Sequence, residues 1–297
     1  MKIKANGIDI EVEDTGGTGP VVVLIMGLGM QLVAWPMQLV DALVAAGFRV
    51  IRHDNRDIGL SQKFDDKGVP NLLWESIKLK LGVTLRPPYS LNDMALDTVG
   101  VLDTLGIAQA HIVGASMGGM IAQRVALAAP QRVLSLTSIM STSGAKGLPN
   151  PKPAIIRALM ASPKGREREA IMKHYVELLR VIGSPAYPME ESLVRERIMV
   201  GLNRSYAPMG TLRQMVAIAA DTGRAKTLAA VSTPTLVIHG RADPLVPFAC
   251  GQDTAKRIPG ARLVAIDGMG HDLPPEVIDL MLTPMLEHLQ TSNGISA

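Results

Sequence analysis

Short runs of β-branched and aliphatic residues alternate along this chain with segments of helical periodicity, and this alternation limits the folds open to it. Residues 21–25 read VVVLI and have no polar position, as in a strand buried on both faces of a parallel sheet. Comparable strand runs occupy 8–13, 48–52, 111–113, 133–139, 235–239 and 262–266. Helices are predicted at 37–45, 93–105 and 117–129. Strands that alternate with helices predict an α/β fold with a parallel sheet and right-handed crossovers.

The alternation stops between residues 144 and 230, where only helical segments are predicted, at 154–160, 166–179, 190–200 and 212–220. This stretch holds 14 Lys+Arg against 7 Asp+Glu, whereas the rest of the chain holds 16 against 20. It also holds six of the 17 methionines. We interpret it as a helical cap over the carboxyl ends of the strands, where open α/β sheets bind ligands. A surface decoration is the alternative. The predicted organisation is a core of 1–143 and 231–297 with a cap of 144–230.

Composition and charge exclude several classes of protein. A single cysteine, Cys250, permits neither an internal disulfide framework nor a cysteine-rich metal site. The longest apolar stretch, 21–30, is shorter than the roughly 18 residues of a membrane span, and residues 1–16 carry no legible secretion signal. Nine aromatic residues offer little for stacking nucleic-acid bases, so the basic surplus of 144–230 predicts a solvated cationic face. We predict a cytoplasmic protein without a membrane span or a nucleic-acid partner.

The pentapeptide at 114–118 reads GASMG, directly after a strand run and directly before a helix. This is the G-x-S-x-G pattern in the context that gives it chemical meaning. A nucleophilic serine must stand clear of the sheet, and glycines on both sides remove side chains that would collide in a tight turn. The helix amino end directs unpaired N–H groups at the same place. Ser116 is therefore the predicted nucleophile.

A serine nucleophile needs a base, and six histidines compete for that role. Four are expected to be structural: His111 and His239 in buried strands, His174 and His288 on helix surfaces. His53 ends the 48–52 strand run and stays an alternative. His271 lies in the glycine-loosened loop IDGMGHDLP after the last strand, from which an imidazole reaches back over the sheet end. We choose His271.

The acid that orients the base is expected on another loop at the carboxyl end of the sheet. Asp243 follows the 235–239 strand in a loop that Pro244 and Pro247 stiffen. Residues 139–145, after the preceding strand, contain no carboxylate. Asp272 is the local alternative, although the side chain next to His271 is expected to diverge from it. The predicted chain order is serine, aspartate, histidine.

Residues 26–29, MGLG, follow the buried strand 21–25 and predict a glycine-rich turn at the same sheet end. Such a turn presents a backbone N–H, here that of Leu28, which pairs with that of Met117 to hold a developing oxyanion. A dinucleotide- or phosphate-binding loop is the rival interpretation. Against that interpretation, the segment lacks a third glycine, an acceptor carboxylate and a following Lys-Ser/Thr.

Together, these loops and the helical insertion resemble the α/β-hydrolase fold over nearly the whole chain. HDNRDIGLS at 53–61 and PGARLVAIDGMGH at 259–271 are similar to the serine carboxylesterase branch that includes aclacinomycin methylesterase-like enzymes. The resemblance implies an α/β fold with a mostly parallel eight-stranded sheet flanked by helices, and an all-helical cap inserted after strand six. The chain departs from the family where many members have His-Gly, because it has Met26-Gly27 there.

The same resemblance implies roles for the residues already singled out. Ser116 is the expected nucleophile, His271 the base and Asp243 the acid, while Leu28 and Met117 supply the oxyanion-hole N–H groups. A serine nucleophile argues against the dehalogenase and epoxide-hydrolase branches, whose nucleophile is an aspartate.

We therefore predict a serine carboxylester hydrolase that acts on a small-molecule ester and needs no cofactor and no metal. Met30, Trp35 and Met120 predict a largely apolar pocket for short to medium acyl groups. The same triad suits C–C bond hydrolysis, lactone opening or perhydrolysis, which remain alternatives. A non-catalytic ligand receptor on the same fold is the alternative from a different class.

Overall fold

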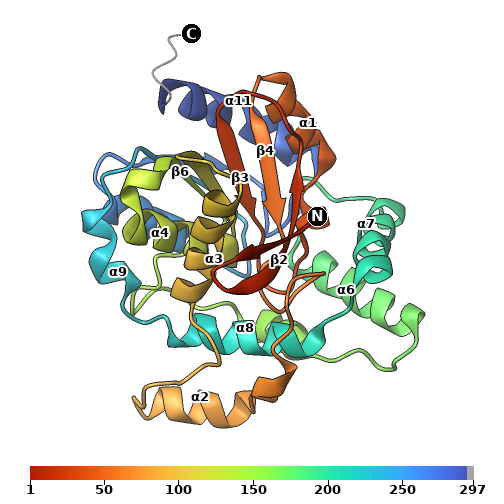
Figure 1. Cartoon of the computed structure of the whole chain (residues 1–297). Coiled ribbons are helices and arrows are strands. Elements are labelled where there is room, and N and C mark those ends of the chain that lie inside the picture. The colour runs from red at the N-terminus through yellow and green to blue at the C-terminus, as the bar shows by residue number, and fades with distance from the viewer. Residues whose placement is uncertain (293–297) are drawn as a thin grey trace.

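The computed structural model describes residues 1–292, which form one eight-stranded sheet between two layers of helices (Figure 1). The strand order is β1-β2-β4-β3-β5-β6-β7-β8. The strands are β1 (Lys2–Ala5), β2 (Ile8–Asp14), β3 (Val21–Ile25), β4 (Arg49–His53), β5 (Ala110–Ala115), β6 (Val133–Ile139), β7 (Thr235–Gly240) and β8 (Arg262–Ile266). β1 and β2 pair antiparallel, and β2 also runs antiparallel to β4. The six strands β4, β3, β5, β6, β7 and β8 pair with one another in parallel, which confirms the predicted fold class.

Alternate residues of the central strands supply two separate cores, one on each face of the sheet. In β3, Val21, Val23 and Ile25 pack with α3 (Leu91–Thr104) and α4 (Met117–Ala128). Val22 and Leu24, from the same strand, pack with α1 (Met37–Ala45) and α11 (Pro275–Ser292). A strand that feeds both faces has no polar position, because neither face meets water. The continuous apolar run VVVLI is therefore explained by its place near the middle of the sheet.

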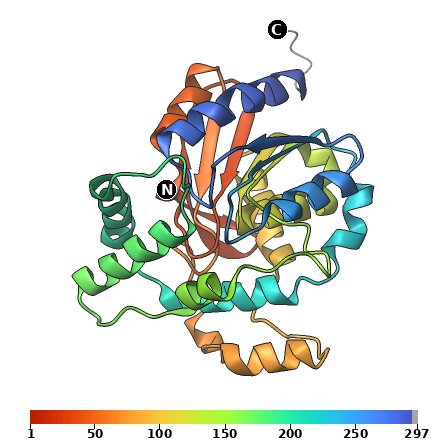
Figure 2. The same ribbon diagram turned by 180° about the vertical axis from the view of Figure 1, so that it is seen from behind.

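Five helices separate β6 from β7 along the chain: α5 (Pro153–Met160), α6 (Arg168–Ile182), α7 (Glu191–Arg204), α8 (Pro208–Ala220) and α9 (Arg224–Thr227). Figures 1 and 2 show that α6, α7 and α8 lie at the end of the sheet toward which β4 points. The all-helical insertion after strand six is confirmed. Whether residues 144–230 act as a separate domain stays a prediction.

The expectation that the basic surplus of the cap is solvated is wrong for several of its arginines. Arg213 and Arg224 are each only 1% exposed. Arg213 pairs with Asp57 of the core at 2.7 Å, and Arg204 pairs with the fully buried side chain of Asp54. Two of the cap arginines, Arg204 and Arg213, therefore face carboxylates of the core, whereas Arg224 pairs with Asp221 of the cap itself.

Besides the short helix α9, one strand and two helices are not predicted from the sequence. β1 reaches β2 through a tight turn in which Asn6 and Gly7 have φ of 49° and 79°, so an Asn-Gly pair marks the hairpin. The strand itself has only four residues, of which only Ala5 is buried. α2 (Leu72–Lys80) buries no residue and α10 (Phe248–Arg257) buries three, so neither packs into a core as the predicted helices do. None of the helices within residues 1–292 is both long and apolar enough to cross a bilayer.

Candidate active site

Ser116 lies in the turn that joins β5 to α4, near the middle of the sheet. It is the N-cap of α4 and has φ 55° and ψ −119°, a conformation that non-glycine residues rarely adopt. Its backbone N–H donates to the Ile139 carbonyl of β6 at 2.9 Å, which fixes the turn to the neighbouring strand. This strained strand-to-helix turn, which we call the elbow, is the geometry that raises a serine hydroxyl above the end of a sheet.

The glycines of GASMG are required by close backbone approaches. A side-chain carbon on Gly114 would lie 2.1 Å from the Gly118 carbonyl oxygen, and one on Gly118 would lie 2.0 Å from the Ile25 carbonyl oxygen. Real side-chain carbons do not approach backbone oxygens so closely, so any larger residue would move α4 away from β3 and β5. The pattern in the sequence therefore has a steric cause.

Three of the predicted residues form a continuous chain of hydrogen bonds. His271 Nδ1 lies 2.7 Å from Asp243 Oδ2, and His271 Nε2 lies 3.0 Å from Ser116 Oγ. An ionised carboxylate only accepts hydrogen bonds, so Nδ1 donates to Asp243 and Nε2 is left to accept from the serine hydroxyl. His271 is 8% exposed, Asp243 6%, and Ser116 is half-buried. The Ser116 hydroxyl thus lies at the accessible end of a buried chain of hydrogen bonds.

The surroundings of Asp243 favour its ionised form. Burial opposes ionisation, but the charge of His271, hydrogen bonds from His239 and His271, and the Val246 N–H together lower the pKa of Asp243 well below its ordinary 3.8. Oδ1 accepts from the N–H groups of Leu245 and Val246 at 2.9 and 2.8 Å. A carboxylate held by these contacts keeps its charge and its orientation near neutral pH.

The remaining histidines lie outside this chain of hydrogen bonds. His53, the alternative base, is 1% exposed and lies 3.2 Å from the Thr98 hydroxyl, and burial lowers its pKa. His239 lies in β7 with Nε2 2.8 Å from the Val246 carbonyl and 3.5 Å from Asp243 Oδ2, so it supports the acid. His288, expected on a helix surface, is half-buried. Its Nε2 lies 3.2 Å from the Leu136 carbonyl oxygen.

Asp272 is turned away from the imidazole beside it in the chain. Its Oδ1 accepts a hydrogen bond from the Ser184 hydroxyl, whose oxygen in turn accepts from the Gly270 N–H at 2.9 Å. Burial raises the pKa of Asp272, against the opposing effect of Ser184 and His271. The side chain therefore links the histidine loop to the segment after α6, and Asp243 is the carboxylate hydrogen-bonded to His271.

The glycine-rich turn after β3 lies against the serine. A side-chain carbon on Gly27 would lie 3.1 Å from Ser116 Cβ and 3.6 Å from Ser116 Oγ. Within residues 1–292, the N–H groups of Leu28 and Met117 have no hydrogen-bond acceptor. Two unpaired donors near one hydroxyl are the arrangement that stabilises negative charge on a tetrahedral intermediate.

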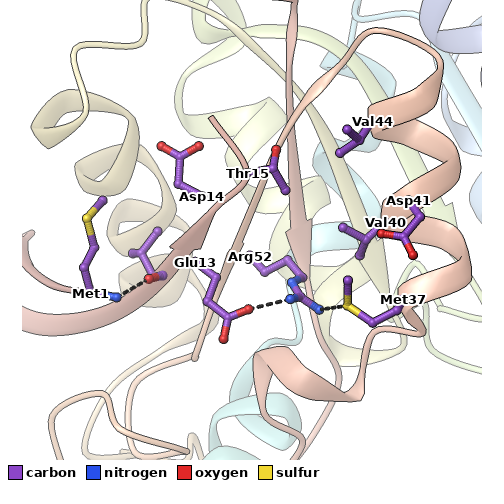
Figure 3. Close-up of a pocket in the computed structure, with 10 residues that line it drawn as sticks. Met1, Glu13, Asp14, Thr15, Met37, Val40, Asp41, Val44 and Arg52 are labelled. Atoms are coloured by element: carbon purple, nitrogen blue, oxygen red, sulfur yellow. Dashed lines mark hydrogen bonds and ion pairs between the residues drawn. The ribbon is translucent and has the colours of Figure 1, made fainter. Parts of the chain in front are cut away.

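The three residues predicted for the acyl pocket have different environments. Met30 is 40% exposed, Met120 is 7% exposed beside the elbow, and Trp35 is 1% exposed in the core shared with α1 and α11. A groove of about 530 Å³ lies elsewhere, between β2, β4 and α1 (Figure 3). Arg52 crosses it to contact Glu13 and the sulfur of Met37. Its lining includes none of the predicted site residues.

Contacts from the helices after β6 hold the turn after β3 and the loop that carries His271, and the sequence does not predict them. Gln214 of α8 is fully buried, accepts from the Gly29 N–H at 3.0 Å and donates to the Arg56 carbonyl at 3.0 Å. The His271 N–H donates to the Ile182 carbonyl at the end of α6, at 2.7 Å. The partners of Gln214 lie 185 and 158 residues away in the chain. No local pattern identifies such a residue.

The family model of the alpha/beta hydrolase fold matches residues 20–276. The chain therefore belongs to the alpha/beta hydrolase fold family, which confirms the resemblance predicted from the sequence.

Individual relatives narrow the comparison. Rhodomycin D methylesterase DauP from a Streptomyces species is 28% identical over 91% of this chain and 90% of its own. A 2-hydroxy-6-oxononadienedioate/2-hydroxy-6-oxononatrienedioate hydrolase from Cupriavidus pinatubonensis is 30% identical, over 88% of this chain and 84% of its own. Among solved structures, a mutant meta-cleavage product hydrolase from Pseudomonas fluorescens has a TM-score of 0.77 at 21% identity, covering 99% of this chain and 98% of its own. That structural likeness concerns the fold.

Proposed function

We propose that this protein is a serine carboxylester hydrolase whose catalytic residues are Ser116, His271 and Asp243. The observation that carries the proposal is the continuous hydrogen-bond chain that ends at a half-buried serine hydroxyl in a strained elbow. An activated serine of this kind forms covalent acyl intermediates. The methylesterase relative supports ester hydrolysis as the reaction.

In the proposed mechanism, His271 Nε2 takes the hydroxyl proton as Ser116 Oγ attacks the ester carbonyl. The resulting oxyanion is held by the N–H groups of Leu28 and Met117, each worth about 3–4 kcal/mol of transition-state stabilisation. Asp243 stabilises the imidazolium that forms, and the imidazolium then gives its proton to the departing alcohol. Water enters the same cycle and releases the acid from Ser116.

The acyl group that this site takes is proposed to be short to medium and largely apolar. Met117 and Met120 are buried beside the serine, and Met30 lies on the turn next to the Leu28 donor. Flexible thioether side chains adapt to apolar ligands of different shape. We also propose that residues 144–230 form a cap domain and that the protein is cytoplasmic.

A panel of p-nitrophenyl esters of increasing acyl length, with Ser116→Ala as the control, tests the reaction. We expect saturable hydrolysis that the variant lowers by at least about 10³-fold. A fluorophosphonate is expected to label Ser116, as mass spectrometry of the adduct would report. An unlabelled serine with full ester hydrolysis would refute the assignment. A ligand receptor with an inactive triad predicts neither hydrolysis nor labelling.

Carbon–carbon bond hydrolysis is the second candidate function. It is favoured by the relative from Cupriavidus pinatubonensis, which is named as a dienedioate/trienedioate hydrolase and is 30% identical to this chain. This reaction would use the same three residues in the same roles, but its substrate is a vinylogous diketone. Adding a ring-cleavage dienoate and a lactone to the panel separates the candidates by kcat/KM. The ester proposal fails if the dienoate reacts far faster and both activities need Ser116.

A further inference from the structure

Large apolar side chains gather on the surface of one short part of the chain, residues 69–83. Within the described residues 1–292, seven of the 19 exposed large hydrophobic side chains fall in this stretch. They are Val69, Leu73, Trp74, Ile77, Leu79, Leu81 and Val83. Soluble proteins scatter such residues singly, and a contiguous group marks an interaction surface.

Helix α2 carries most of this group and presents it outward. Three exposed residues of the helix and its C-cap residue recur at helical spacing and form what we call the apolar stripe: Leu73, Trp74, Ile77 and Leu81. Their exposed fractions are 74%, 55%, 39% and 75%. The charged pair Glu75 and Lys78, which meet at 2.7 Å, is less exposed than the stripe. The helix therefore differs from a core-packed helix in that its apolar side chains face solvent.

Cationic residues border the apolar stripe. Three of them, Lys78, Lys80 and Arg86, form what we call the cationic rim, against one carboxylate, Glu75, in residues 72–86. Lys78 and Arg86 line a groove of about 400 Å³ with Val83 and Thr84. Neither Lys80 nor Arg86 pairs with a carboxylate in the part of the chain that the structure describes. Two of the three cations are therefore free to meet an anionic partner.

The stripe lies at the outer end of the molecule. Figures 1 and 2 agree that α2 projects beyond α8, on the side of the sheet where the cap helices gather. α8 is the element against which α2 packs. A flat partner can therefore approach α2 without meeting the rest of the core.

We propose that residues 69–86 dock the protein reversibly on an anionic lipid surface, with the apolar stripe among the acyl chains and the cationic rim at the headgroups. An amphipathic helix with Trp and Leu on one side and lysines at its border lies in the membrane interface in this way. Anionic headgroups attract each nearby cation. A second copy of the chain suits this surface less well, because a symmetric contact brings two cationic rims together. The proposal does not rest on the proposed ester hydrolysis.

The two tryptophans of the chain make the docking directly measurable. Trp35 is 1% exposed, so a change in emission on adding vesicles reports Trp74, which is 55% exposed. We expect a blue shift and co-sedimentation with vesicles of phosphatidylcholine and phosphatidylglycerol. Phosphatidylcholine vesicles and inorganic phosphate are expected to give little change, and high salt to weaken the binding.

Variants separate the two parts of the surface. Leu73→Ser/Leu81→Ser is expected to lower partitioning about tenfold or more by removing apolar area. Lys80→Gln/Arg86→Gln is expected to lower it about 25-fold on anionic vesicles, at roughly fivefold for each cation. Leu280→Ser is the matched control, because Leu280 is 47% exposed on α11 at the opposite end of the molecule. It is expected to bind like the parent protein.

Other outcomes overturn the proposal. They are unchanged Trp74 emission with every vesicle, equal loss in the Leu280→Ser control, or a lipid-free dimer in light scattering that Leu73→Ser/Leu81→Ser dissociates. Hydrolysis of a water-soluble ester is measured for each variant and is expected to stay unchanged, since none of these residues contacts Ser116 or His271. Failure of docking is thereby distinguished from failure of the proposed reaction.

Discussion

Two aspartates neighbour the His271 imidazole: Asp243 contacts it in space, and Asp272 follows it in the sequence. Their surroundings give the two carboxylates different roles. Asp243 Oδ2 accepts from His271 Nδ1 at 2.7 Å, whereas Asp272 accepts from Ser184. The pKa of Asp243 is lowered, because its charged and hydrogen-bonding partners outweigh the opposing effect of burial. The pKa of Asp272 is raised, because burial outweighs its partners. The first is held as an anion for its histidine, and the second joins two backbone segments.

Replacing each carboxylate in turn tests this difference. Asp243→Asn removes the acceptor that sets the imidazole tautomer, and we expect kcat for ester hydrolysis to fall on the order of 10⁴-fold. Asp272→Asn is the matched control and is expected to cost less than about tenfold, because its partner is Ser184. Circular dichroism establishes that both variants fold. A dead Asp272 variant beside an active Asp243 variant would reverse the assignment.

At the scale of elements, the cap helices hold the loops on which the proposed chemistry depends. Gln214 of α8 fixes the turn that carries the Leu28 donor, through the Gly29 N–H. The carboxyl end of α6 fixes the histidine loop through the Ile182 carbonyl. Both contacts join segments distant in sequence, so the cap contributes to the geometry at Ser116 as well as covering the sheet.

Removing the Gln214 amide should therefore affect the transition state more than substrate binding. In Gln214→Met, the Gly29 N–H loses its acceptor, and the turn at residues 26–29, the proposed source of one oxyanion-hole donor, loosens. We expect kcat to fall about 10- to 100-fold with a small change in KM, together with weaker binding of a trifluoromethyl ketone that forms an oxyanion. Gln123→Met is the control, since Gln123 is equally buried but lies on α4 away from the turn. Equal losses in both variants would indicate general destabilisation.

The sequence predicts local features of these elements well and distant contacts poorly. Residues 21–25, 37–45, 133–139 and 262–266 begin and end where predicted, because each has a pattern of its own. The elbow is recognisable for the same reason: its glycines are fixed by contacts among neighbouring elements. Gln214 carries no such signal, because its role arises only when α8 meets the turn after β3. The same holds for His288, whose burial depends on β6 packing beneath α11.

At the scale of the whole molecule, the cap and the core are joined by ion pairs buried between them. Arg213 of α8 donates to both carboxylate oxygens of Asp57, at 2.7 and 2.8 Å, and the two side chains are 1% and 0% exposed. Burial opposes the charge of Asp57, yet Arg213 and the Phe64 N–H keep its pKa below 3.8. The charge asymmetry between cap and core in the sequence is thus part of the interface that joins them.

Breaking this pair should destabilise the fold. Arg213→Met leaves Asp57 buried without its partner, and we expect the free energy of unfolding to fall by about 3–5 kcal/mol in urea denaturation. Arg180→Met is the control, because Arg180 is 64% exposed and its pair with Glu177 lies in solvent. Its expected effect is below about 1 kcal/mol. If the two variants unfold at the same urea concentration, the buried pair does not stabilise the cap–core contact.

The stability of the whole molecule is also expected to depend on pH through His288. Burial, more than the opposing contact with the Leu136 carbonyl, lowers the pKa of His288 from 6.5 to about 4. Between these two values the unfolded chain binds the proton and the folded chain does not, so stability falls as pH falls from 6.5 toward 4. At pH 5 the loss from this histidine is about 2 kcal/mol relative to pH 7.5. We expect His288→Gln to lack that part of the loss. Urea denaturation of both proteins at the two pH values measures it, and an equal loss in both would show that His288 takes up its proton in the folded state as readily as in the unfolded one.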